Sequence, residues 1–230
     1  MDAKRIIPVL QVRDDHVVDG TGASLGHPAE RAGRLEQEGA DGVIFQAWGG
    51  AGLGRAAWVR EVAGSLFVPF AVEAAFAGLE ELDALLAGGA DQAILPSVAA
   101  GDTLLAEAAL RFGRCHVAAA VTAQAVGDRW RVTPAGAGEG WDALAWMAEL
   151  EQRGAGEILL QLAPAGAGAE SLFQGTARLA LPVLFRSAGG EAEWAGAMLN
   201  GADGIAFPAE LRSAGACKSA LAVHGLSLRQ

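Results

Sequence analysis

The chain has 230 residues, 52% of them apolar, and its 27 acidic residues against 17 basic ones give a formal charge of −10. This acidic balance, without any cluster of basic residues, argues against nucleic acid and anionic membranes as partners. The two cysteines are too few for a disulfide framework and the four scattered histidines have no ligand-like spacing, so we expect no metal and no cofactor. The N-terminus has the apolar length of neither a signal peptide nor a membrane span, which favours a cytoplasmic protein.

Eight short apolar runs, each typical of a buried strand, follow one another along the chain. They lie near residues 6–11, 43–47, 70–74, 93–97, 116–121, 157–162, 183–187 and 204–208. Amphipathic helical stretches separate them, for example 28–38, 79–87, 102–112, 141–153 and 193–199. This alternation predicts right-handed crossovers and a parallel sheet. The one sizeable insertion is residues 127–140, and residues 128–133 within it are expected to form a small hairpin beyond the fifth strand.

A short motif that begins with glycine and alanine marks the step from helix to strand four times. The copies are Gly39-Ala40-Asp41, Gly89-Ala90-Asp91, Gly154-Ala155-Gly156 and Gly201-Ala202-Asp203. In each copy the glycine can take the left-handed conformation that ends a helix, and an apolar strand begins within a few residues. The first and third copies, like the second and fourth, lie half the chain apart. This two-fold repeat favours a single (β/α)8 TIM barrel domain over residues 1–230; a doubly wound open sheet is the alternative.

An ordered series of segments carries a family resemblance: residues 3–8, 12–14, 17–20, 38–41, 68–70, 89–91, 153–160 and 217–229. In these segments the chain is similar to the cyclase subunit of imidazole glycerol phosphate synthase (HisF), from histidine biosynthesis. The sister isomerase of the same pathway (HisA) shares the barrel but fits the N-terminus and residues 154–160 less well. The resemblance implies a barrel that takes ammonia from a glutaminase docked at its bottom face. It also implies two aspartates at the top face, acting as acid and base on a substrate held by two phosphate sites.

Most of the residues to which this resemblance assigns chemistry are replaced. The two aspartate positions hold Gln11, at the end of the first strand, and about Val121, which Thr122 follows. The phosphate-binding turns hold Ala74-Ala75, Arg186-Ser187-Ala188-Gly189-Gly190 and Pro208-Ala209 in place of the family's motifs. Nearly all these changes fall at the carboxyl ends of strands, which is the face that carries the chemistry of a TIM barrel.

These replacements lead to two hypotheses of function. A glutamine amide cannot act as general acid or base near neutral pH, and a positioned proton-transfer group contributes about 10²–10⁴-fold to a rate. The first hypothesis is therefore a pseudoenzyme, a HisF-like barrel that has lost the cyclase (lyase) chemistry and acts by binding or complex formation. The alternative is a diverged enzyme, of lyase, cyclase or isomerase type, on a small phosphorylated metabolite. It would use Glu73 as its base and Arg186 as its phosphate ligand.

The mouth of the barrel distinguishes the two hypotheses. An enzyme predicts an open, ordered pocket in which Glu73 and Arg186 converge. A binding or scaffold protein allows a mouth that is plugged by Trp48, Phe76 or collapsed loops, with an exposed apolar patch elsewhere.

The best remnant of an anion site follows the seventh strand, at Arg186, Ser187, Gly189 and Gly190. A guanidinium binds phosphate well and would replace the backbone donors of the family. The alternative for Arg186 is a surface arginine that pairs with a nearby carboxylate such as Glu73.

Three glutamines, Gln11, Gln46 and Gln161, also fall near carboxyl ends of strands. Together with Glu73 they would form a polar mouth for an uncharged or cationic ligand. Strand alternation leaves open whether Gln46 and Glu73 face the helices instead.

At the opposite end of the barrel, Arg5 and Glu157 match positions that in the family help to gate the ammonia entrance. Two other gate positions are changed, to Gly42 and Gln92. A structural salt bridge through the barrel floor is the simpler interpretation of this half-kept gate. The resemblance still leads us to expect a glutaminase-like or other protein subunit as a partner at the bottom face. At the top face we expect a small anionic ligand.

Overall fold

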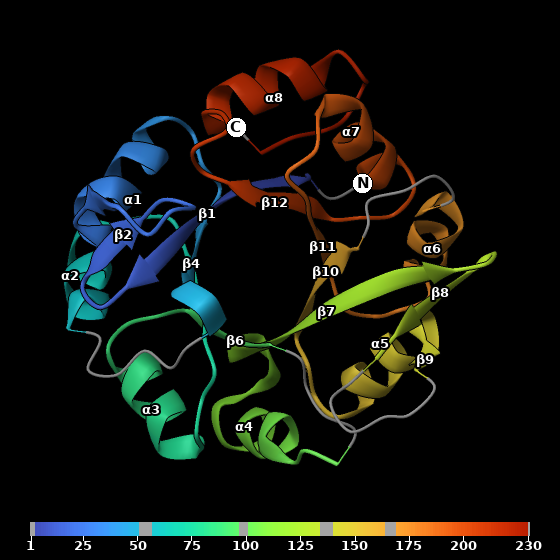
Figure 1. Cartoon of the computed structure of the whole chain (residues 1–230), viewed down its shortest axis with the longest axis horizontal. Coiled ribbons are helices and arrows are strands. Elements are labelled where there is room, and N and C mark those ends of the chain that lie inside the picture. The colour runs from blue at the N-terminus through green and yellow to red at the C-terminus, as the bar shows by residue number, and fades with distance from the viewer. Residues whose placement is uncertain (1–2, 51–56, 97–100, 134–139, 164–168, 230) are drawn as a thin grey trace.

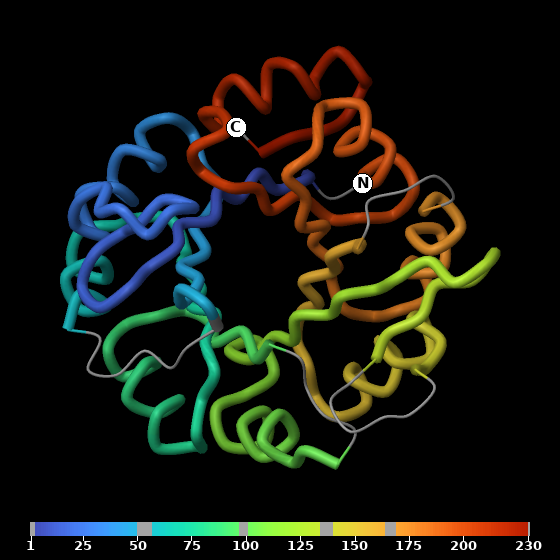
Figure 2. Tube along the Cα trace, in the orientation of Figure 1, coloured from blue at the N-terminus to red at the C-terminus, as the bar shows by residue number. Residues whose placement is uncertain are grey.

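The computed structural model describes residues 3–50, 57–96, 101–133, 140–163 and 169–229. Eight parallel strands pair side by side and close into a barrel, because the last strand pairs with the first. In order around the barrel they are β1 (Arg5–Arg13), β4 (Val43–Ala47), β5 (Phe70–Glu73), β6 (Gln92–Pro96), β7 (Val117–Val126), β10 (Glu157–Leu162), β11 (Val183–Arg186) and β12 (Gly204–Pro208). Figures 1 and 2 show this ring of strands with the helices outside it. The predicted TIM barrel is confirmed.

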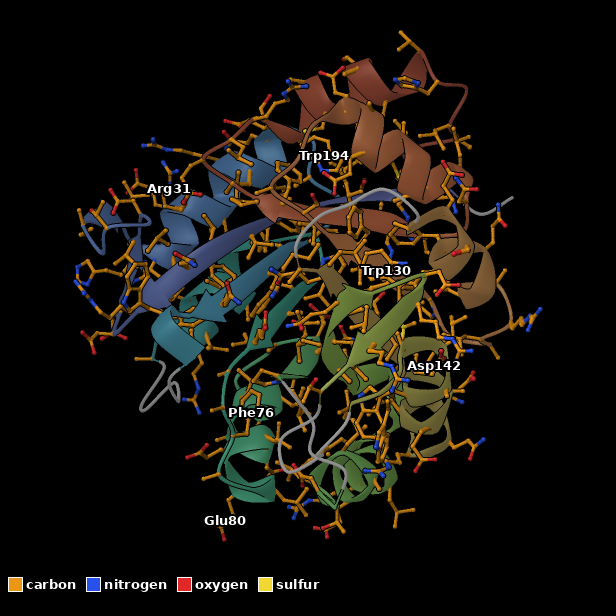
Figure 3. The ribbon with its side chains drawn as sticks, turned by 45° about the vertical axis from the view of Figure 1, so that its right-hand side comes forward. Arg31, Phe76, Glu80, Trp130, Asp142 and Trp194 are labelled. Carbon is orange, nitrogen blue, oxygen red and sulfur yellow. The ribbon has the colours of Figure 1, made fainter. Side chains whose placement is uncertain are left out.

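Eight α-helices within the described residues surround the strands. They are α1 (Pro28–Gln37), α2 (Trp58–Ser65), α3 (Leu79–Ala87), α4 (Leu104–Phe112), α5 (Ala143–Gln152), α6 (Ala169–Thr176), α7 (Glu191–Leu199) and α8 (Ala214–Ala222). The larger apolar core lies between strands and helices, with Phe45 against Trp58 and Phe207 against Trp194. Figure 3 shows Trp194 of α7 turned toward the strands, whereas Glu80 of α3 points away from them. A smaller cluster fills the barrel interior: Ile7, Val9, Ile44, Ile94, Ala118, Leu159, Leu184 and Ala206.

Two hairpins extend barrel strands beyond the carboxyl-end rim. β1 turns at Asp14, which has a φ of 54°, into β2 (His16–Val18), and β2 pairs with β3 (Ser24–Gly26). β7 turns at Gly127 into β8 (Arg129–Val132), which pairs with β9 (Trp141–Asp142). A hairpin is present beyond the fifth strand, as expected, but the bounds predicted for it were wrong, because residues 123–126 of β7 form its first strand and β8 is its second. Trp130 of β8 is buried, and the hairpin lies against α5 (Figure 3).

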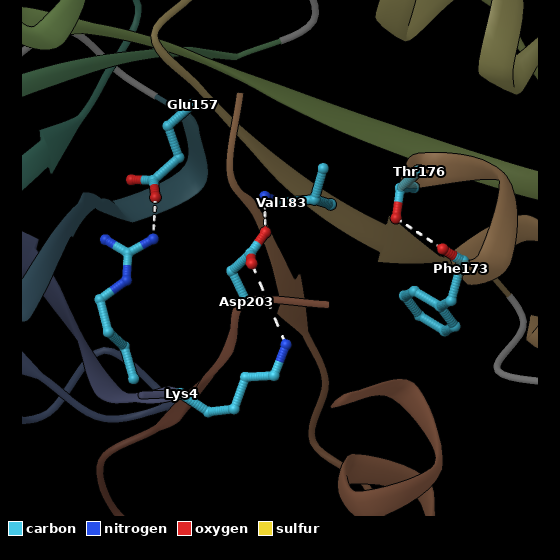
Figure 4. A network of polar contacts seen from close by, with 7 residues as sticks. Lys4, Glu157, Phe173, Thr176, Val183 and Asp203 are labelled. Carbon is cyan, nitrogen blue, oxygen red and sulfur yellow. Dashed lines mark hydrogen bonds and ion pairs between the residues drawn. The ribbon is translucent and has the colours of Figure 1, made fainter. Parts of the chain in front are cut away.

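The repeated aspartates hold the amino ends of neighbouring strands. In each copy that has one, a carboxylate oxygen accepts a 2.8 Å hydrogen bond from a backbone N–H: Asp41 from Ile6, Asp91 from Phe70, and Asp203 from Val183. Figure 4 shows the contact of Asp203 together with its ion pair to Lys4. The remaining copy has Gly156, where a Cβ atom would lie 1.9 Å from the carbonyl oxygen of Arg114. The repeat is therefore a structural device of the barrel floor.

Candidate functional site at the mouth of the barrel

Polar side chains meet at the carboxyl end of the barrel because strand alternation points them inward. Ile7 and Val9 belong to the interior cluster, so Gln11, two residues further on, faces the same side. Strand register sets the polar residues in two rows on opposite walls of the barrel. One row is Gln11, Gln46 and Glu73, on β1, β4 and β5. The other row is Thr122, Gln161 and Arg186, on β7, β10 and β11. The question that alternation left open for Gln46 and Glu73 is settled, since Gln46 lines the mouth and Glu73 bonds across it.

Glu73 and Arg186 join the two rows across the barrel. Nη1 of Arg186 donates to Oε1 of Glu73 at 3.1 Å, and Nη2 donates to the other carboxylate oxygen. Only 13% of the Arg186 side chain and 7% of the Glu73 side chain are exposed. The pairing that we gave as the alternative for Arg186 is thus present. The expectation that such an arginine would lie at the surface was wrong, because the side chain follows the inward parity of β11.

The turn after β11 is occupied by a carboxylate of the chain itself. The hydroxyl of Ser187 accepts a 2.9 Å hydrogen bond from the backbone N–H of Gly189 and donates one of 2.9 Å to Oε2 of Glu193. Gly190 is the N-cap of α7, so Glu193 lies in the first turn of that helix, where a negative charge is stabilised. A Cβ atom at Gly189 would lie 1.6 Å from Oε2 of Glu193. Glu193 therefore covers the turn in which we predicted an anion.

A cavity of about 750 Å³ opens at this end of the barrel, a volume typical of small-molecule sites. Among the described residues its polar lining consists of Gln11, Gln46, Gln161, Arg186, Ser187, Glu193 and Glu210. Gly189 also lines it, whereas Gly190 and Glu73 do not. Neither Trp48 nor Phe76 plugs it, and Phe76 packs against the helix-side core. As far as residues 3–50, 57–96, 101–133, 140–163 and 169–229 show, the mouth is open, as an enzyme would require, but Glu73 and Arg186 converge on each other.

A second ion pair crosses the opposite end of the barrel. Arg5 of β1 bonds the carboxylate of Glu157 on β10, as Figure 4 shows beside Lys4 and Asp203. Burial raises the pKa of the Glu157 carboxyl group, and the positive charge of Arg5 opposes this effect. A cavity of about 170 Å³ beside the pair is lined by Gly42, Gln92 and Asp91, among others. The floor therefore contains a salt bridge at the two retained gate positions.

Comparison with known proteins identifies the family of this barrel. The histidine biosynthesis protein family matches residues 5–165 of the chain. The imidazole glycerol phosphate synthase subunit HisF of Metallosphaera sedula is 38% identical over 170 residues, which are 70% of this chain and 68% of that protein. This chain belongs to the HisF family.

Further HisF proteins match over similar lengths. The HisF subunit of Campylobacter concisus is 38% identical over 168 residues, which cover 69% of this chain and 67% of the relative. That of Dehalococcoides mccartyi is 36% identical over 167 residues, which cover 68% and 66%. The matched part of each HisF relative is thus about two thirds of its length.

The residue predicted at the second aspartate position of HisF, about Val121, does not face the mouth. Val121 belongs to the core between strands and helices, so its side chain faces away from the mouth. Ala118 and Ala120 of the same strand pack in the barrel interior, and Thr122 shares their parity and lies beside Gln161. The residue of β7 that faces the mouth at this level is therefore Thr122, one residue after the predicted position. Neither Gln11 nor Thr122 has a carboxyl group.

Sequence reasoning missed Glu193 and Glu210 as lining residues. An acidic residue in the first turn of a helix that follows a Ser-x-Gly-Gly turn was the available signal for Glu193. No group of three or more His, Cys, Asp or Glu side chains in the described part of the chain is arranged to hold a metal ion. None of the described helices is long and apolar enough to cross a membrane.

Proposed function

We propose that this HisF-family barrel is a cytoplasmic, non-catalytic member of its family, which acts by binding a ligand at its mouth or a protein subunit at its floor. One observation carries the proposal: along the eight barrel strands, all of them described, the only carboxylates are Glu73 and Glu157, and both are ion-paired. Glu157 lies at the floor, so Glu73 is the single carboxylate of the strand ends at the mouth.

General acid–base chemistry needs a group that can gain or lose a proton within reach of the substrate. The amide of Gln11 and the hydroxyl of Thr122 do not titrate near neutral pH. Both oxygens of Glu73 accept hydrogen bonds from Arg186, and Glu73 does not line the cavity. The mouth therefore offers the family's reaction no proton-transfer pair on the strands that would carry it.

The phosphate cradles are weakened as well. Pro208 lines the cavity at the end of β12 and has no backbone N–H to donate. The turn after β11 is covered by the carboxylate of Glu193, which repels a phosphate. A substrate that depends on two phosphate contacts loses binding at the same end of the barrel at which the acid and base are missing.

The same contacts weigh against the alternative of a diverged enzyme acting on a small phosphorylated metabolite. That enzyme needs Glu73 free as a base and Arg186 free as a phosphate ligand. In the structure each uses the other as its partner inside the barrel. A ligand would have to replace a buried charge pair before either group could serve in catalysis.

A protein partner at the floor is the second part of the proposal. HisF relatives are named as a subunit of imidazole glycerol phosphate synthase. Phe67, which follows α2 at this end of the barrel, is 94% exposed, and the neighbouring Pro69 and Phe70 line the floor cavity. An exposed aromatic side chain beside a shallow cavity favours contact with another subunit, such as a glutaminase-like protein.

Ammonia-dependent turnover of the HisF substrate tests the proposal. The purified chain is compared with the Metallosphaera sedula relative and with its own Glu73→Gln variant. We expect a rate at least about 10⁴-fold below that of the relative, because two proton-transfer groups are missing. A measurable rate that Glu73→Gln removes would replace this proposal with the diverged enzyme.

A further inference from the structure

The cavity at the mouth presents acceptor groups that the protein itself leaves unused. No side-chain hydrogen bond within the described residues engages the amides of Gln11, Gln46 and Gln161, although all three line the cavity. Oε2 of Glu193 accepts a hydrogen bond from the hydroxyl of Ser187. The other carboxylate oxygen of Glu193 has no partner in the described part of the chain. Glu193 lines the cavity, and a carboxylate oxygen accepts hydrogen bonds only, so this free oxygen is available to a ligand that donates one.

The charge of the described lining is negative. Glu193 and Glu210 are acidic, and Arg186 is the one basic residue among the described lining residues. The charge of Arg186 is neutralised within the barrel by Glu73. Arg212 does not add a free positive charge, since it pairs with Glu191 in the first turn of α7. The described lining therefore favours cations over anions.

Glu193 occupies the part of the mouth that is best suited to an anion. The hydroxyl of Ser187, which the N–H of Gly189 holds in place, and the N-terminus of α7 both favour negative charge here. The chain supplies that charge itself, and the distance to a Cβ atom at Gly189 shows that the carboxylate lies directly on the turn. A phosphate group would have to displace Glu193 and then lie beside it.

We propose that the mouth of this barrel binds a small organic cation, an amine or guanidinium compound that also carries hydroxyl or amide groups, and that Glu193 selects it against phosphorylated compounds. The cationic group bonds the free oxygen of Glu193, and Gln11, Gln46 and Gln161 bond the polar remainder. This inference rests on the proposed function, in which the barrel acts by binding, and it names the ligand class of that site.

Binding measurements on the full chain test this inference. The probes are agmatine, putrescine and ethanolamine as cations and inorganic phosphate and ribose 5-phosphate as anions, each titrated to about 10 mM at constant ionic strength while the melting temperature is followed. We expect the guanidinium or amine probes to raise the melting temperature and the phosphates to leave it unchanged. Failure of every cation to stabilise the protein, or stabilisation by phosphate alone, overturns the inference.

Two variants of the first turn of α7 locate the effect. Glu193→Gln keeps a hydrogen-bond acceptor for Ser187 but removes the charge, whereas Glu191→Gln removes an equal charge that pairs with Arg212. We expect Glu193→Gln to weaken cation binding by about 10-fold or more and to allow phosphate binding, and Glu191→Gln to change neither. Equal weakening by both variants would contradict a site at Glu193.

The turnover assay separates the two proposals. A chain that binds a cation through Glu193 and also turns over the HisF substrate refutes the proposed function alone. A chain with no turnover and no cation binding refutes this inference alone.

Discussion

Glu73 and Arg186, 113 residues apart in the chain, extend from opposite walls of the barrel and form a buried, two-bond ion pair. The Arg5–Glu157 pair crosses the barrel at its other end, and an apolar cluster lies between the two. The upper pair uses the two charges that a diverged enzyme would need as its base and its phosphate ligand. We expect substitutions in these two ion pairs to change the free energy of unfolding.

Removing one partner of the upper pair should be costly. Arg186→Ala leaves Glu73 buried without its partner, which typically destabilises a protein by about 3–5 kcal/mol. The measurement is the free energy of unfolding in urea. The exposed Arg111, which pairs with Asp83, gives the control, since Arg111→Ala should cost about 0–1 kcal/mol.

The double variant Glu73→Gln with Arg186→Met should recover most of the lost stability, because no charge then remains buried without a partner. Two single losses that simply add in the double variant would show that the pair does not act as a unit.

The lower pair predicts a dependence of stability on pH. Burial raises the pKa of Glu157 above its ordinary value of 4.5, so in the window above 4.5 the folded state keeps a proton that the unfolded state releases. The stability contributed by the protonated form is therefore present below pH 4.5 and is lost as pH rises through the raised pKa. We expect the free energy of unfolding of the wild type, relative to Glu157→Gln, to fall as the pH rises above 4.5 and through the raised pKa. A relative stability that rises with pH would mean that the charge of Arg5 outweighs burial.

The two cysteines should differ sharply in reactivity. Cys217 of α8 is fully buried, and burial raises the pKa of its thiol to about 11, whereas Cys115 is exposed. At pH 8 a thiol-specific reagent should label one cysteine rapidly in the native protein and both after unfolding, since the thiolate is the reactive form. Cys115→Ser should abolish the rapid phase and Cys217→Ser should leave it. Rapid labelling of the Cys115→Ser variant would contradict the burial of Cys217.

The repeated aspartates should matter for stability more than exposed acidic residues do. Asp91→Ala leaves the N–H of Phe70 without its acceptor, and Asp203→Ala does the same for Val183. An unsatisfied buried donor costs about 1–3 kcal/mol. Asp83→Ala, which removes an exposed carboxylate, is the matched control in urea unfolding. Equal losses for all three variants would remove the structural reason for the repeat.

Much of the fold could be predicted because short, local sequence patterns determine it. The apolar runs and the glycines that end helices recur at regular spacing, and the closed barrel follows from their alternation. The hairpin of β2 and β3 was missed because its strands are only three residues long. The sequence left the mouth-facing residue of β7 at about Val121, and the structure gives Thr122, since a shift of one residue along a strand moves a side chain to the other face.

The candidate site was only partly predictable, because its key contacts depend on strand register. The sequence places Glu73 and Arg186 at strand ends, but only the closed barrel shows that they meet. The sequence predicted Gln11, Gln46 and Gln161 as polar residues near strand ends. The structure shows that they line one cavity. The contact between Glu193 and Ser187 depends on the residue at which α7 begins.

Ammonia-dependent turnover of the HisF substrate decides whether this barrel is catalytic, and it is best measured for the wild type together with a Gln11→Asp, Thr122→Asp double variant. We expect no turnover above background for the wild type, and none for the double variant, because the altered phosphate turns remain. A wild-type rate within about 100-fold of the Metallosphaera sedula relative would contradict it, since that is less than the loss expected from two missing proton-transfer groups.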